Sequence, residues 1–219
     1  MFILPLSYLG PLQLYCRYYA NQVILIEQHD TYQKQSYRNR CDIYGANGRL
    51  SLSIPVKHLS GHRLKLKDVR IDYATDWRRL HWKGIVSAYN SSPYFQYYMD
   101  SFEPFYFKEF TFLIDLNQRL NEEVLKILGC KIMPEFTNDF IPFQKSIKEE
   151  GNESDIMDLR AIIHPKISLE YDSGYSSFEY IQVFSQVHGF IPNLSILDLI
   201  FNMGPESGRV LSSCVRLKA

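Results

Sequence analysis

The spacing of hydrophobic and polar positions changes several times along the chain, and each change predicts an element. Residues 1–11 are apolar residues interrupted by two prolines and a glycine, which predicts a short buried strand followed by a tight turn. Residues 12–20 are expected to form a helix. The apolar, β-branched run at residues 23–26 predicts a fully buried strand.

Strict alternation of apolar and polar residues follows in the next segment. Strands are expected near residues 40–44 and 49–56, joined by Asn47-Gly48, because both turn residues tolerate the positive φ of a type I′ turn. Residues 69–72 alternate in the same way, which predicts another half-buried strand.

Helical spacing dominates the middle of the chain. Asp76 is expected to cap a helix over residues 77–89. A second helix is expected to start at Ser92, with Pro93 in its first turn, where a missing N–H costs nothing.

The clearest helix covers residues 113–128, where apolar residues recur every three or four positions. Thr111 is expected to cap its start, and Gly129 stands where a helix-ending glycine belongs. Further helices are predicted over residues 178–188 and 196–202, the last closed by Gly204-Pro205.

These elements predict an α/β protein with a mixed sheet that includes the hairpin and is flanked by helices, with α+β as the close alternative. The length of 219 residues favours a single domain over residues 1–219. Residues 143–156 are a Lys-, Glu-, Asn- and Ser-rich insertion, which we interpret as a mobile, solvated loop in preference to a lid over a site.

Charge and composition argue against two kinds of partner, nucleic acids and membranes. The chain has 24 basic and 24 acidic residues, so nothing favours a nucleic-acid partner, although a local basic pocket for one phosphate group is compatible with this balance. The absence of a run of about 20 apolar residues argues against a membrane span, and the N-terminus does not resemble a signal peptide.

The four cysteines are scattered and the six histidines form no metal-binding motif. This pattern predicts reduced thiols in a cytoplasmic protein with no metal and no cofactor. Oligomeric state does not follow from the sequence.

The densest group of chemically versatile residues directly follows the 23–26 strand. Arginine presents a fork of donors that fits phosphate or carboxylate, lysine adds a point charge, and asparagine orients a neighbour. An anionic ligand would therefore be expected here; the alternative is a solvated strand whose cations pair with Glu27 and Asp30. The candidate ligand-binding residues are Lys34, Tyr37, Arg38, Asn39 and Arg40.

His81 is the candidate general base, because histidine titrates near neutral pH. The alternative is a packed histidine beside Trp82. Cys41 next to two arginines raises a thiol-nucleophile hypothesis, but a small buried strand cysteine is the preferred interpretation.

Two later segments add candidates. Tyr89 and Tyr94 belong to an aromatic turn that suits sugar rings or bases, although a capped helix start explains most of it. Asn193 precedes the apolar C-terminal helix, and Asp198 and Asn202 lie in it; Ser195 and Asp198 have capping-box spacing.

In this order, these segments resemble the WbqC-like family of bacterial proteins over most of the chain. The resemblance is carried by the 5–11 turn, Lys34, Asn39-Arg40, Ile43, Asn47-Gly48, Ile54-Pro55-Val56, Asp76-Trp77, His81-Trp82, Tyr89, Ser92-Pro93-Tyr94-Phe95, Leu128-Gly129, and the run from Phe190 to Pro205.

The resemblance implies a setting more than a reaction, namely O-antigen, capsule or other surface-polysaccharide synthesis with nucleotide-activated sugars. It strengthens the choice of Lys34, Asn39 and Arg40. It weakens the thiol hypothesis, because other branches of the family have asparagine in place of Cys41.

Two functions stay open. The first is an enzyme that transfers an acyl or aminoacyl group to a nucleotide-activated amino sugar, with His81 as base, Asp198 as orienting carboxylate, and the cations on phosphate. The second is a non-catalytic module that binds a glycan or partner in a polysaccharide-synthesis complex. A third interpretation is that the polar segments only brace the fold.

Overall fold

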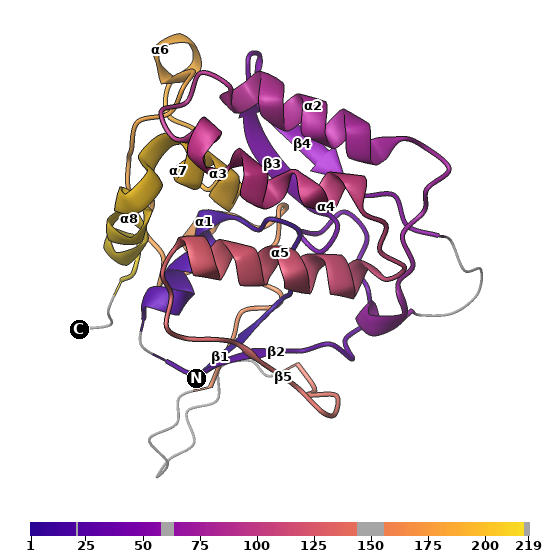
Figure 1. Cartoon of the computed structure of the whole chain (residues 1–219). Helices are drawn as coiled ribbons and strands as arrows, with labels where there is room; N and C mark the ends of the chain where they lie inside the picture. The colour runs from indigo at the N-terminus through magenta and orange to yellow at the C-terminus, as the bar shows by residue number, and fades with distance from the viewer. Residues whose placement is uncertain (21, 58–63, 144–155, 217–219) are drawn as a thin grey trace.

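A computed structural model describes residues 1–20, 22–57, 64–143 and 156–216 (Figure 1). Four short strands form a parallel sheet in the order β5-β2-β1-β6. They are β1 (Phe2–Leu4), β2 (Ile24–Ile26), β5 (Glu135–Phe136) and β6 (Met157–Asp158). Phe2 of β1 aligns with Ile24 on one side and Met157 on the other, so the first strand of the chain lies inside the sheet.

The antiparallel hairpin is confirmed as a separate pair of strands, β3 (Arg40–Gly45) and β4 (Gly48–Ser53). The expected turn geometry is wrong. Gly45 pairs with Gly48, so Ala46 and Asn47 are the turn residues, and only Gly48 among these has positive φ, at 97°.

Helix α2 (Trp77–Tyr89) has the predicted bounds, although Asp76 makes no capping hydrogen bond and its carboxylate binds Arg79 at 2.7 Å. Helix α3 (Phe95–Phe102) begins later than predicted, because Ser92 and Pro93 form a turn in which Ser92 N–H donates to the Tyr89 carbonyl. The short helix α4 (Pro104–Phe107) follows.

Helix α5 (Leu113–Ile127) is confirmed, and Gly129 ends it with a φ of 63°. Its N-cap is Phe112 instead of Thr111, since the Leu113 N–H donates to the Val69 carbonyl and fixes the start of the helix. Helix α7 (Ile196–Met203) is confirmed, and the Ser195 hydroxyl caps it.

Other predicted elements are shorter or absent. The 12–20 helix is divided into α1 (Leu12–Tyr15) and the 3-10 turn η1 (Cys16–Tyr19), and only α6 (Ser185–His188) remains of the 178–188 helix. Val23 is 55% exposed and precedes β2. Residues 69–72 make isolated bridges only, although Val69 and Ile71 are buried as expected.

Several elements were not predicted: the two-residue strands β5 and β6, the 3-10 turns η2 (Leu66–Asp68), η3 (Leu169–Tyr171) and η4 (Gly204–Glu206), and helix α8 (Ser207–Ser213). In Figure 1, α5 runs between the parallel strands on one side and α2, α3 and the hairpin on the other. One large apolar cluster connects β1, α1, the hairpin, α2, α5 and α7.

The α/β class with a β-hairpin and flanking helices is therefore confirmed. Most of the predicted 143–156 insertion, residues 144–155, lies outside the described residues. Within the described ranges, no helix combines the length and the apolar character that crossing a bilayer requires.

Candidate functional site

All four parallel strands end at the same edge of the sheet, and buried polar residues follow them. Ser7 follows β1, Glu27 follows β2, Thr137 follows β5, and β6 ends at Asp158, two residues before Arg160. In open parallel sheets, ligands bind outside the carboxyl ends of the strands. This carboxyl edge is therefore the first candidate site.

The chain connections single out the region between β1 and β6. From β1 the chain proceeds to β2 and β5 on one side of the sheet, and β6 returns on the opposite side of β1. Segments that leave β1 and β6 diverge at such a reversal, and this divergence is what creates a binding crevice in doubly wound sheets.

Glu27 binds the ends of neighbouring strands together. Its buried carboxylate accepts hydrogen bonds from the His29 N–H at 2.6 Å, the Thr137 hydroxyl at 3.1 Å and the Ile141 N–H at 2.6 Å. Three donors compensate for burial of the charge, so Glu27 is part of the frame of this edge.

Two ion pairs at this edge contain buried arginines. Arg38 donates to Asp30 at 2.7 Å, and Arg160 forms a forked pair with Asp158 at 2.9 and 2.6 Å. Burial lowers the pKa of Arg38; the charge of Asp30 opposes this effect, and the charge of Arg160 adds to it. The two guanidinium groups are therefore close enough to repel each other.

Positive charges at this edge also act on the neighbouring His164. Its pKa is lowered by burial and then by the positive charges of Arg38 and Lys166. Cations from two separate chain segments, Arg38 from one and Arg160 and Lys166 from the other, thus converge at the carboxyl edge.

Two buried nitrogens of this region, Arg38 Nε and His29 Nε2, have no hydrogen-bond partner among the described residues. The Nε of a guanidinium always carries a proton, so Arg38 retains a buried donor whose lost hydration is not replaced. Such atoms are uncommon in folded proteins and require an explanation.

Arg40 lies in a second polar cluster, on the hairpin. The buried Asp42 accepts from Arg40 at 3.1 Å, from Arg49 at 3.2 Å and from the Ser51 hydroxyl at 2.6 Å. Burial, with a smaller contribution from Asp42, raises the pKa of Tyr37 to about 12.

The C-terminal motif lies against this hairpin. The Ser195 N–H donates to the Asp42 carbonyl at 2.7 Å, and Arg49 donates to the Pro192 carbonyl at 3.2 Å. Asn193 has a φ of 55° and accepts from the Gln13 N–H at 2.8 Å. The segments that carry Arg40 and Asn193 are therefore adjacent.

Asp198 lies in a separate network, in which four side chains of the protein form hydrogen bonds with its carboxylate. Its carboxylate accepts from Tyr180 at 2.6 Å, Gln182 at 2.8 Å, Tyr89 at 3.0 Å and Asn202 at 3.4 Å. Burial raises its pKa to about 6, and these hydrogen bonds limit the increase.

His81 belongs to a third network. Its Nδ1 is 3.0 Å from the Tyr8 hydroxyl, which is 2.8 Å from the Tyr106 hydroxyl, and its ring packs against Trp77. Burial lowers the pKa of His81 to about 4. Among the described residues, no hydrogen bond joins His81 to Asp198.

The remaining candidates occupy different places. Lys34 is exposed near Arg38 in sequence, and the Asn39 amide donates to the Ile54 carbonyl at 2.8 Å. Tyr94 packs its ring against Gly204. The structure thus brings Tyr89, Asp198 and Asn202 together, and separately Arg40 with the Asn193 segment.

Sequence patterns missed the residues after β5 and β6, namely Thr137, Asp158 and Arg160. The one available signal was the forked Asp-x-Arg spacing, which is too common to select a site. Cys41 is buried, and burial raises its pKa, which opposes thiolate formation.

Three pockets of about 270, 420 and 450 Å³ lie between other elements, and the predicted ligand residues line none of these three. Within the described ranges, no group of three or more His, Cys, Asp or Glu side chains has the arrangement of a metal site.

Comparison with known proteins identifies the family. The model of the WbqC-like protein family matches residues 8–210, which include the carboxyl edge, the hairpin and the C-terminal helix. The chain belongs to the WbqC-like protein family. The predicted resemblance is thereby confirmed.

A relative of this WbqC-like protein is found in Mycobacterium tuberculosis, the "Uncharacterized protein Rv1507c". It is 27% identical over 205 residues, covering 84% of each chain. No solved structure matches the chain.

Proposed function

We propose that this WbqC-like protein binds a phosphorylated sugar, such as a nucleotide sugar, at the carboxyl edge of its parallel sheet. The observation that carries the proposal is the buried Arg38 guanidinium, which is close to the charge of Arg160 and retains an unpartnered Nε–H. A phosphate oxygen is the acceptor that such a donor fits best.

The segment from Lys34 to Arg40 extends this site toward the hairpin. Arg38 donates to Asp30 at the sheet edge, whereas Arg40 donates to Asp42 on the hairpin. The Asp42 backbone carbonyl accepts from the segment that contains Asn193. We assign Arg38 and Lys34 to the phosphate, and Arg40 with Asn193 to the sugar end of the ligand.

The same proposal places the protein in bacterial surface-polysaccharide synthesis as a transferase. The amino group of the sugar would attack the carbonyl carbon of an activated acyl or aminoacyl donor, such as a thioester. The new amide bond forms, the donor's carbon–sulfur bond breaks, and His81 takes the proton lost by nitrogen and passes it to the departing thiolate.

A non-catalytic binding module is the second candidate, and one observation favours it. His81 and Asp198, the proposed base and its orienting carboxylate, lie in different hydrogen-bonded networks whose partners are the protein's own side chains. Binding would then position a glycan or sugar nucleotide for another enzyme.

Isothermal titration against UDP-, GDP- and dTDP-linked sugars tests the binding proposal. We expect Lys34→Ala, Arg40→Ala and Arg38→Lys each to weaken binding by about tenfold or more, because each removes a charge-assisted contact or the planar fork. Lys34 is exposed, so its variant is expected to keep the native fold.

Arg79→Gln is the matched control, since Arg79 is an exposed arginine on α2 paired only with Asp76 among the described residues. Its affinity should equal that of the wild type. Unchanged affinity in all three test variants, or no binding of any sugar nucleotide, would refute the proposal.

Transfer itself is tested by His81→Gln in a protein that still binds ligand. Loss of acyl transfer with intact binding would support the enzyme, whereas full biological activity of this variant would support the binding module.

A further inference from the structure

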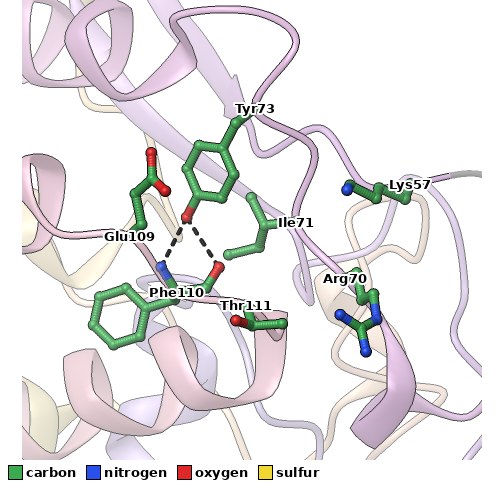
Figure 2. Close-up of a pocket in the computed structure, with 7 residues that line it drawn as sticks. All are labelled: Lys57, Arg70, Ile71, Tyr73, Glu109, Phe110 and Thr111. Atoms are coloured by element: carbon green, nitrogen blue, oxygen red, sulfur yellow. Dashed lines mark hydrogen bonds between the residues drawn. The ribbon is translucent and has the colours of Figure 1, made fainter.

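A pocket outside the carboxyl edge contains two cations that no carboxylate of the described residues neutralises. It has a volume of about 270 Å³, and Figure 2 shows the side chains that line it. They are Lys57, Arg70, Ile71, Tyr73, Glu109, Phe110 and Thr111. The three candidate functions above do not use any of these residues.

The pocket wall is a platform of three extended segments. The Lys57 N–H donates to the Arg70 carbonyl at 2.9 Å, and the Ile71 N–H donates to the Thr111 carbonyl at 3.1 Å. Bridges pair Val56 with Ile71 and Arg70 with Phe112. The backbone therefore fixes the positions from which both cations project.

Tyr73 makes the far wall rigid. Its hydroxyl accepts from the Phe110 N–H at 2.9 Å and donates to the Phe110 carbonyl at 3.0 Å, as the dashed lines in Figure 2 show. This double hydrogen bond holds residues 109–111 in place, so the pocket is formed before any ligand binds.

The one carboxylate that lines the pocket is already neutralised. Glu109 accepts from Arg78 at 3.1 Å, and Arg78 also stacks on the Tyr73 ring at 5.0 Å. In Figure 2, Glu109 and Lys57 lie on opposite sides of the Tyr73 ring. The nearby Asp72 carboxylate accepts from the Ala74 N–H and does not line the pocket.

Lys57 and Arg70 have no carboxylate partner within the described ranges. Lys57 is exposed, and the Arg70 guanidinium lies 4.8 Å from the Phe112 ring centroid, which orients it without neutralising its charge. The six residues that follow Lys57 in the sequence contain no acidic residue. Together with Arg78 against Glu109, the pocket carries an excess of two positive charges.

We propose that this pocket is an anion site that takes the phosphate group of a small monophosphate. Lys57 provides a point charge, Arg70 offers two parallel donors to phosphate oxygens, and the Thr111 hydroxyl is a further donor. The pocket volume of about 270 Å³ suits a phosphate group with a small substituent better than a whole nucleotide sugar.

Phosphorus-31 NMR titration with inorganic phosphate at low ionic strength tests this site in the full chain. We expect Lys57→Gln and Arg70→Gln each to weaken phosphate binding by about tenfold, since each removes one of two charge-assisted contacts. Lys67→Gln is the matched control, because Lys67 is an exposed cation that does not line the pocket, and its affinity should change less than about twofold.

Equal weakening in all three variants would indicate a diffuse charge effect and would overturn the proposal, as would an absence of millimolar phosphate binding to the wild type. Titration with a sugar nucleotide distinguishes this site from the carboxyl edge. Lys57→Gln and Arg70→Gln should leave the affinity for sugar nucleotides unchanged, because neither residue belongs to that edge.

Discussion

His81 and Asp198 are both buried, and burial favours the neutral form of each side chain. It therefore lowers the pKa of His81 and raises the pKa of Asp198. The pKa of His81 falls to about 4 and that of Asp198 rises to about 6. His81 shares a hydrogen bond with the Tyr8 hydroxyl, and Asp198 accepts hydrogen bonds from the Tyr89 and Tyr180 hydroxyls. The two shifts therefore make opposite contributions to the pH dependence of stability.

The direction of each contribution depends on whether the unfolded or the native state binds more protons at a given pH. As pH falls from 6.5 to 4, the unfolded chain protonates His81 while the native protein does not, so the free energy of unfolding falls. As pH rises from 4 to 6, the unfolded chain releases the proton of Asp198 while the native protein keeps it, so the free energy of unfolding also falls. Each effect is worth about 3 kcal/mol, at about 1.4 kcal/mol per pKa unit.

We predict that single variants reveal these opposed contributions. Between pH 4 and 6, the free energy of unfolding should rise more steeply in Asp198→Asn than in wild type, and it should rise less steeply or fall in His81→Gln. Urea denaturation at pH 4, 5, 6 and 7 measures both slopes. Identical slopes in the two variants would show that neither residue titrates as its burial requires.

At the scale of single elements, two glycines with positive φ offer a matched comparison. Gly129 ends α5 with a φ of 63°, and a Cβ atom there would meet no other atom within 4 Å. Gly204 ends α7 with a φ of 52°, and a Cβ atom would lie 2.5 Å from the Tyr94 ring. Only the second position adds a steric conflict to the backbone strain.

We therefore predict different costs for the same substitution. Gly129→Ala should destabilise the protein by about 1 kcal/mol, the usual cost of a left-handed residue with a side chain. Gly204→Ala should cost at least about 2 kcal/mol more, because Tyr94 must move. Denaturation midpoints measure both values.

Removing the Tyr94 ring tests whether it causes the extra cost at Gly204. The double variant Gly204→Ala, Tyr94→Ala should be less destabilised than the sum of its single variants. If the costs at Gly129 and Gly204 are equal, the close packing of Tyr94 on Gly204 is not a feature of the native protein.

The elements that the sequence predicted well are those whose pattern is local. Helices α2, α5 and α7 have amphipathic or apolar repeats with clear ends, and the hairpin has alternating residues around a short turn. Strands β5 and β6 have two residues each and exist because β2 and β1 pair with them. No local pattern of two residues predicts such pairing.

The candidate site divides in the same way. Lys34, Arg38 and Arg40 follow an apolar strand in a dense polar run, so composition and position selected them, and the family resemblance strengthened the choice of Lys34 and Arg40. Arg160 and Thr137 enter the carboxyl edge only through the order of the strands, which connects segments more than 100 residues apart. His81 and Asp198 were paired by chemical type, and the fold assigns them to separate networks.

One buried ion pair, Arg17 with Asp172, joins two segments that are 155 residues apart in the sequence. Arg17, in η1, contacts both carboxylate oxygens of Asp172 and donates to the Gly174 carbonyl at 2.9 Å. Gln13 also donates to Asp172 at 2.9 Å. The pair therefore holds the segment before the C-terminal helices against the N-terminal turn that follows β1.

The contributions of Arg17 and Asp172 to the free energy of unfolding should be strongly coupled. Arg17→Met or Asp172→Leu alone leaves an uncompensated buried charge, and each should destabilise the protein by about 3–5 kcal/mol. The double variant should cost several kcal/mol less than the sum, because neither charge then remains. Chemical denaturation of the four proteins yields the coupling energy.

The exposed pair Arg119 and Glu122 on α5 is the control for this cycle. Because water screens these charges, their coupling should not exceed about 0.5 kcal/mol. Additive effects at Arg17 and Asp172 would mean that this ion pair does not hold the two segments together. A large coupling would instead establish that this ion pair holds residues 172–174 against η1.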